Sequence, residues 1–177
     1  MSLRHGLLGL LAEGPASGYD LARRFQDVLG AVWPAQHPKI YAELNRLAAE
    51  GYVEAEVAGP RGRKAYHITE QGLAEVRRWL TQTEVDHTMR LQPILRSVFF
   101  WLMSREELQR HLEHESEYYR TAAEQYAALA AAKDRGEFGD TSQTRALRIA
   151  AEAAIRLHTA LAEWAEWAQS VDLESDS

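Results

Sequence analysis

The chain has 177 residues, enough for one domain or two small ones, and its 46% hydrophobic and 26% charged content is ordinary for a globular protein. It contains no cysteine, which excludes disulfides, iron–sulfur clusters and thiolate zinc sites. The net charge of −6 is uneven: residues 1–80 carry 10 Lys and Arg against 9 Asp and Glu, and residues 81–177 carry 10 against 17. We therefore expect a polyanionic partner to bind to the first half of the chain and not to the acidic second half.

The two apolar stretches that could serve as targeting segments are too short for that role. Residues 1–14 reach Glu13 too soon for a signal peptide. Residues 98–103 are far fewer than the number needed to cross a bilayer. We expect a cytoplasmic protein with no membrane partner.

The first 30 residues predict two short helices. Leucines between positions 3 and 11 form the first, which Gly14 and Pro15 end. Ser17 caps the second, with Asp20 three residues later in place of the usual Glu of a capping box. Apolar residues at helical spacing continue to Gly30.

A third amphipathic helix is predicted over residues 38–50, with Pro38 in its first turn and Gly51 after its end. Its buried stripe is expected to be Ile40, Leu44, Leu47 and Ala48. The residues expected to point away from the core are Lys39, Tyr41, Glu43, Asn45, Arg46 and Glu50.

A β-hairpin with a basic tip follows this helix. Residues 52–57 alternate apolar and polar side chains, residues 65–69 form the return strand, and the loop between them carries Arg61, Arg63 and Lys64. Thr69 caps a fourth helix, with Leu73, Val76 and Leu80 expected to face inward. Three helices, a hairpin and a fourth helix predict a winged helix-turn-helix domain over residues 1–85.

This order offers a helix for a DNA major groove and a cationic hairpin for the adjacent backbone or minor groove. Each basic residue alone fits a solvated surface as well; together those of the hairpin can contact phosphates. The predicted DNA-binding residues are Ser17, Tyr19, Gln36, His37, Lys39, Tyr41, Asn45, Arg46, Arg61, Arg63 and Lys64. The alternative from another class is a winged-helix adaptor that binds proteins without specific DNA binding.

The stretches GLLGLLAEGPASGYDLARRF, KIYAELNRLAAEGYV and GPRGRKAYHITEQGLAEVRRWL resemble the PadR-like transcriptional regulators. The resemblance covers nearly the whole first half. It implies a winged-helix domain, a C-terminal helical dimerisation region, and repression of promoters with dyad-symmetric operators. One departure is the entry to the third helix, Gln36-His37-Pro38, where such proteins often have Ser, Thr or Gly.

The second half predicts a helical domain over residues 91–171, built on two long antiparallel helices after a compact apolar segment at residues 91–103. Ser104 and Glu107 form a capping box for the first long helix, which runs to about Lys133. Its inward edge is expected to include Leu108, Leu112, Tyr119, Ala122, Tyr126 and Leu129. The fold class is therefore mainly α with a small β-hairpin.

The last helix, capped by Asp140 or Thr141, carries apolar residues alternately three and four apart, as in a heptad seam. The predicted dimerisation residues are Leu147, Ala150, Ala154, Leu157, Leu161 and Trp164. The seam can pack within one chain, against a second copy, or both. We expect a homodimer, because this half carries more large aromatic surface than two helices can bury alone.

A small-molecule effector and a metal ion are the remaining partners that the sequence suggests. Trp33, Phe99, Trp101, Tyr118 and Tyr119 are candidates to line a pocket for a small aromatic ligand, although such residues more often belong to a core. Some PadR-like proteins respond to flat aromatic compounds. His111 and His114 on one helix face suggest a metal only weakly. Without a phosphate loop or nucleophile motif, we expect neither an enzyme nor a cofactor.

Overall fold

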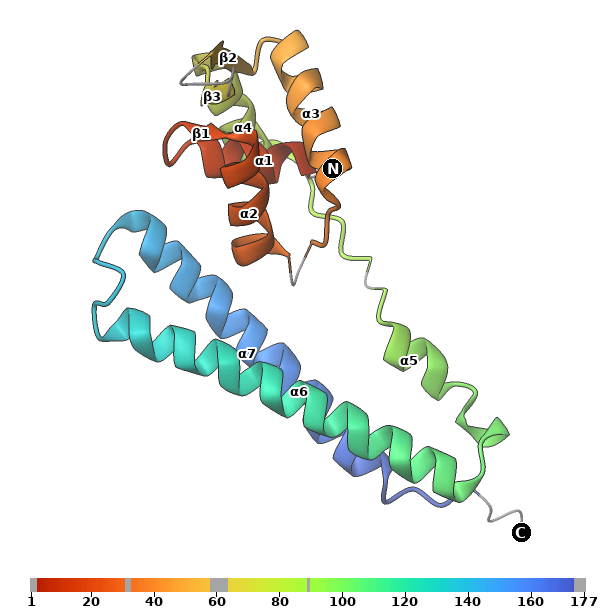
Figure 1. The fold of residues 1–177 in the computed structure, drawn as a ribbon. Helices are drawn as coiled ribbons and strands as arrows, with labels where there is room; N and C mark the ends of the chain where they lie inside the picture. The colour runs from red at the N-terminus through yellow and green to blue at the C-terminus, as the bar shows by residue number, and fades with distance from the viewer. Residues whose placement is uncertain (1–2, 31–32, 58–63, 89, 174–177) are drawn as a thin grey trace. The chain divides into compact units, whose positions relative to one another are not determined.

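The computed structural model describes residues 3–30, 33–57, 64–88 and 90–173 (Figure 1). It divides into two compact units, Met1–Thr88 and Met89–Ser177, and each is described by itself. The predicted fold class, mainly helical with a small antiparallel sheet, is confirmed.

The first unit contains α1 (Leu3–Leu11), β1 (Ala16–Ser17), α2 (Gly18–Leu29), α3 (His37–Ala49), β2 (Val53–Val57), β3 (Lys64–Ile68) and α4 (Glu70–Gln82). Both β1 and β2 pair with β3 in antiparallel fashion, so β3 is the middle strand. The strand β1 was not predicted, because two residues show no alternation. It aligns Ala16 with Tyr66 across the sheet.

One apolar core joins the helices to the sheet. Its fully buried side chains come from all three N-terminal helices and from β2: Leu7, Leu8, Leu11, Leu21, Phe25, Ile40, Leu44, Leu47 and Val53. Each such side chain contributes roughly 1.5–3 kcal/mol through burial. The predicted stripe of α3 is therefore confirmed for its three large residues.

Local capping fixes where the helices begin. The Ser17 hydroxyl accepts the Asp20 N–H at 3.1 Å and donates to the Asp20 carboxylate at 2.6 Å. The carboxylate therefore bonds the hydroxyl itself, unlike the Glu of a capping box. Thr69 caps α4 as predicted: its hydroxyl accepts the Gly72 N–H at 3.1 Å and donates to the Gly51 carbonyl at 2.8 Å.

Two predictions of side-chain direction in this unit are wrong. Glu43 was expected to point outward but is 9% exposed, because arginines contact its carboxylate. Leu80 was expected to face inward but is 67% exposed. On α4 the apolar contact to α1 is made instead by Trp79, whose ring stacks on His5 with centroids 4.7 Å apart.

The second unit contains α5 (Gln92–Ser97), the 3-10 helix η1 (Phe100–Leu102), α6 (Arg105–Asp134) and α7 (Ser142–Ala168). α6 and α7 lie side by side and run antiparallel (Figure 1). The Ser104–Glu107 capping box is confirmed, with the Ser104 N–H donating to Glu107 at 2.9 Å. Thr141 caps α7.

Few side chains are buried between these two helices. Phe100, Leu112 and Ala165 form one small cluster, and Tyr119, Leu161 and Ala162 form another. Leu129, predicted to face inward, is 49% exposed, and Ala130 is buried in its place. The apolar segment at residues 91–103 buries Phe100 but leaves six other large side chains exposed within the chain: Ile94, Leu95, Val98, Phe99, Trp101 and Leu102.

Candidate nucleic-acid interface

The outer side of α3 presents the polar residues that the sequence predicted for DNA. Lys39, Tyr41, Asn45 and Arg46 are exposed, opposite the buried stripe. Gln36 and His37 are exposed at the start of the helix, where Gln36 is the N-cap residue and its side chain makes no capping hydrogen bond. The structure therefore brings these six residues together on one helix.

Small residues lie among these polar ones. Pro38, Ala42 and Ala49 are also exposed on α3, and Ala42 precedes Asn45 by one helical turn. An alanine allows a helix to approach bases closely, and its methyl group can contact the methyl of thymine. The prediction from sequence omitted Ala42, although its spacing of three residues from Asn45 was a usable signal.

Tyr41 lies at the junction between α3 and the start of α2. Its ring lies so close to Gly18 that a Cβ placed there would be 2.6 Å from the ring Cε1 atom. Tyr66 of β3 lies on the other side, and burial together with the nearby Tyr41 raises the pKa of Tyr66 above its usual value. The Tyr66 phenol is therefore neutral at pH 7.

At the start of α2, Tyr19 is 59% exposed and free to reach a ligand. Ser17 is only half-buried, but its hydroxyl donates its proton to Asp20. A hydroxyl has one proton to donate. Ser17 can therefore contact a phosphate only by breaking that bond, and its main effect is to start the helix.

The stem of the wing is formed by β2 and β3. Lys64, the first residue of β3, is exposed and lies opposite Val57 in the register. On the same stem, His67 lies 3.5 Å from Glu56. Arg61 and Arg63, predicted to contact phosphates, lie outside the described residues.

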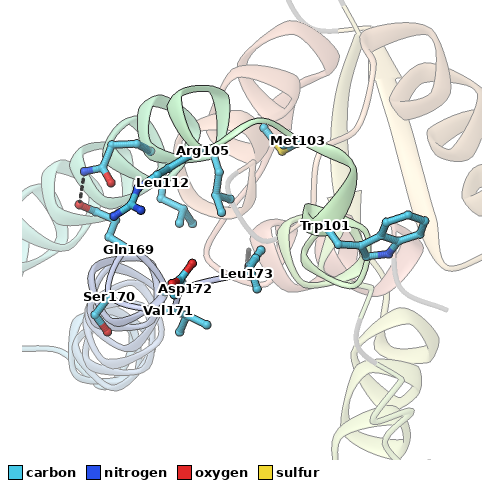
Figure 2. Close-up of a pocket in the computed structure, with 12 residues that line it drawn as sticks. Trp101, Met103, Arg105, Leu112, Gln169, Ser170, Val171, Asp172 and Leu173 are labelled. Atoms are coloured by element: carbon cyan, nitrogen blue, oxygen red, sulfur yellow. Dashed lines mark hydrogen bonds between the residues drawn. The ribbon is translucent and has the colours of Figure 1, made fainter. Parts of the chain in front are cut away.

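The proposed ligand-pocket residues of the second unit do not meet in one cavity. Trp101 lines a hollow at one end of the α6–α7 pair (Figure 2). Met103 and Arg105, at the start of α6, and Gln169 and Leu173, which follow the end of α7, also line it. Across it, the Gln109 amide donates to the Gln169 amide oxygen at 3.3 Å.

The other aromatic candidates lie elsewhere. Tyr118 lines a second hollow on α6, with its ring edge-on to that of Tyr119 at 5.3 Å. Burial and the neighbouring Glu115 raise the pKa of Tyr119 to about 12. Phe99 is 52% exposed, and Trp33, in the loop before α3, is 40% exposed.

The predicted dimerisation seam divides into two parts. Leu161 is buried against α6, and Trp164 packs on the cluster of Phe100 and Leu112. Leu147 and Leu157 are 45% and 42% exposed. Ala150 is exposed and Ala154 is partly buried. The end of α7 therefore packs inside the chain, while the leucines nearer its start remain accessible.

The described residues contain neither a metal-binding cluster nor a helix that could cross a membrane. No three His, Asp or Glu side chains among them are grouped so as to hold a metal ion. In the same part of the chain, no helix combines the length and the hydropathy that a membrane crossing requires.

The arrangement of the first unit, a three-helix core with the third helix exposed beside a β-hairpin, is that of a winged-helix domain. The predicted resemblance to PadR-like regulators is also confirmed. The model of the "Transcriptional regulator PadR-like family" matches residues 7–78, which lie within the winged-helix unit.

Two curated proteins resemble this chain. The negative transcriptional regulator PadR of Bacillus subtilis is 34% identical over 109 residues, which is 59% of this chain and 60% of that protein. A probable transcriptional regulator of Mycobacterium tuberculosis is 39% identical over 85 residues, 46% of this chain and 45% of that protein. The match thus spans about half of each relative.

Solved structures resemble the chain over nearly its whole length. Bacillus subtilis PadR in complex with operator DNA matches with a TM-score of 0.84 at 23% identity, covering 96% of this chain and 98% of that one. The same protein in complex with p-coumaric acid matches with a TM-score of 0.78 at 25% identity, covering 95% and 96%. These likenesses establish the fold.

Proposed function

We propose that this protein is a homodimeric, sequence-specific DNA-binding regulator, and that it represses transcription from a dyad-symmetric operator. The observation that carries the proposal is the exposed side of α3, where hydrogen-bonding side chains surround small residues. Asn45 suits adenine and Arg46 suits guanine through paired hydrogen bonds. Such a regulator acts in the cytoplasm and needs neither a cofactor nor catalytic residues.

A second copy of the chain is supported by the apolar surface of the second unit. Trp101 and Trp167 are 68% and 65% exposed, alongside Leu147 and Leu157. Large apolar side chains left exposed in a single chain favour an interaction site. A two-fold dimer would present two recognition helices, and their half-sites would lie about one helical turn apart or a multiple of it.

Relief by a small aromatic ligand is the regulatory part of the proposal. It is supported by the aromatic hollows of the second unit and by the similar protein that binds p-coumaric acid. The test is titration of p-coumaric acid into the protein–DNA complex. Release of DNA at ligand concentrations that also change tryptophan fluorescence supports relief; unchanged DNA binding and fluorescence argue against this ligand.

DNA binding is tested by fluorescence anisotropy with duplexes tiled across the region upstream of the coding sequence, at two salt concentrations. We expect saturable binding to one tile, much tighter than to the others. Weak binding to all tiles that disappears at the higher salt would mean phosphate attraction without specificity. Absence of binding at both salts would favour the adaptor function.

The wing is tested with Arg63→Ala. Loss of one phosphate contact should weaken binding to all tiles and reduce the slope of log affinity against log salt by about one. The matched control is Arg96→Ala, which removes the same charge from α5 of the second unit. An unchanged slope for Arg63→Ala would remove this residue from the phosphate contacts.

A further inference from the structure

Glu43 is a charged residue on the predicted recognition helix, yet it is only 9% exposed. It precedes the buried Leu44 and lies on the side of α3 that faces α1. Carboxylates are rarely buried unless they are paired with cations. The position of Glu43 therefore depends on the groups that surround its two oxygens.

Each oxygen of this carboxylate accepts a hydrogen bond from a different arginine. Oε1 accepts from Arg4 Nε of α1 at 3.1 Å, and Oε2 accepts from Arg46 Nη1 of α3 at 2.7 Å. Arg4 is itself anchored, because its Nη2 lies 3.0 Å from the Glu50 carboxylate and its guanidinium lies 5.6 Å from the centre of the Tyr52 ring. Glu43 is thus a fixed acceptor.

Arg46 differs from Arg4 in its surroundings. Its side chain is 62% exposed, against 25% for Arg4, and it follows Asn45 on the outer side of α3. A guanidinium carries five N–H donors. Within the described part of the chain, the bond to Glu43 uses one of them, which leaves four donors, on Nε, Nη1 and Nη2, for a ligand outside the protein.

We propose that Glu43 is a positioning residue that directs the Arg46 guanidinium toward one base edge and so sets the base preference of α3. The inference rests on the proposed DNA-binding function. A long exposed side chain loses conformational freedom when a complex immobilises it. Because Glu43 already holds Arg46 in the free protein, part of that loss does not occur on binding. This advantage exists only when the base at that position can accept hydrogen bonds from Arg46 in the held orientation.

The charge change in Glu43→Gln distinguishes positioning of Arg46 from nonspecific attraction to DNA phosphates. Glu43, Arg4, Arg46 and Glu50 together have no net charge, so Glu43→Gln makes the surface more positive by one. Nonspecific attraction to phosphates should then stay equal or rise. A fall in base preference without a fall in nonspecific affinity therefore points to lost positioning.

The test is a double-mutant cycle on base preference, measured as the ratio of affinities for the selected tile and a scrambled duplex of the same composition. The variants are Glu43→Gln, Arg46→Ala and the double variant. The matched control is Glu152→Gln in the second unit, which breaks ion pairs of a carboxylate with Arg148 and Arg156 on α7.

We expect Glu43→Gln to lower the ratio about two- to tenfold and Arg46→Ala to lower it about 5- to 150-fold. In the Arg46→Ala background, Glu43→Gln should have no further effect, and Glu152→Gln should leave the ratio unchanged. An equal effect of Glu43→Gln in both backgrounds, or no effect in either, overturns the positioning role while DNA binding stands. A wild-type protein without preference for any duplex overturns both proposals.

Side-chain NMR of the unmodified protein provides a measurement that does not depend on the stability of a variant. A guanidinium held by Glu43 should rotate slowly about its Nε–Cζ bond in the DNA-free protein. Rotation of Arg46 as fast as in free arginine contradicts the proposal.

Discussion

Gly18→Ala should separate DNA binding from stability. The new Cβ would lie 2.6 Å from Tyr41 Cε1 and 3.3 Å from Cδ1, where ordinary contacts are 3.4–4 Å. The ring must therefore move by roughly 1 Å. Because Tyr41 is 39% exposed, it can swing outward, at a cost of about 0.5–1.5 kcal/mol for an unfavourable rotamer. Replacing Gly by Ala in a helix returns up to about 1 kcal/mol, so stability should change little.

DNA binding should respond more strongly, because the moved phenol no longer lies beside the start of α2. Loss of one hydrogen bond of about 1 kcal/mol corresponds to roughly fivefold weaker binding. Anisotropy with the selected tile measures this loss, and thermal unfolding measures stability. The control is Gly9→Ala, since no atom beyond its chain neighbours and its own helix backbone lies within 4 Å of its added Cβ. Equal DNA affinities for the two variants would refute the placement of Tyr41 at the interface.

Three further outcomes are expected. Arg78 and then His5 donate hydrogen bonds to Glu75 and lower its pKa from 4.5 to about 2. This contribution, at most about 3 kcal/mol, is complete above pH 4.5 and is lost as the pH falls toward 2. In urea unfolding, the deficit of Glu75→Gln should therefore shrink over that range; a constant deficit contradicts the assignment. Gly72→Ala places a Cβ 2.2 Å from the Tyr52 carbonyl oxygen and should cost about 3 kcal/mol in thermal unfolding, whereas a loss below about 1 kcal/mol would show that the backbone gives way. Leu157→Glu should dissociate the proposed dimer in light scattering while Leu80→Glu, an equally drastic change on α4, should not; equal masses would exclude Leu157 from the interface.

The sequence predicts the parts of this fold that depend on neighbours along the chain. The caps at Ser104, Thr141 and Thr69 use residues within three positions of each other, and the stripe of α3 follows from helical spacing. The strand β1 was not predicted, because its Ala16 pairs with Tyr66, which lies fifty positions away in the sequence.

In the candidate site, too, features set by nearby residues were predicted and features set by residues far apart in the sequence were not. Spacing along α3 placed Lys39, Asn45 and Arg46 on one surface, as the structure has them. The inward position of Glu43 could not be predicted from α3 alone, because its partner Arg4 lies 39 residues earlier in the chain. The aromatic residues of the second unit were grouped by type, whereas the structure distributes Trp101 and Tyr118 between separate hollows.

The short strand β1 has a mechanical consequence. Ser17 pairs with Ala65 in the sheet and also caps α2, so the stem of the wing and the start of α2 are joined through one residue. Tyr19 and Lys64, 45 positions apart in sequence, therefore belong to one rigid frame. A surface whose anchor points already have a fixed spacing loses little freedom when it docks on a rigid, regularly spaced polymer. The two-residue strand β1 thus sets the distance between Tyr19 and Lys64 before DNA binds.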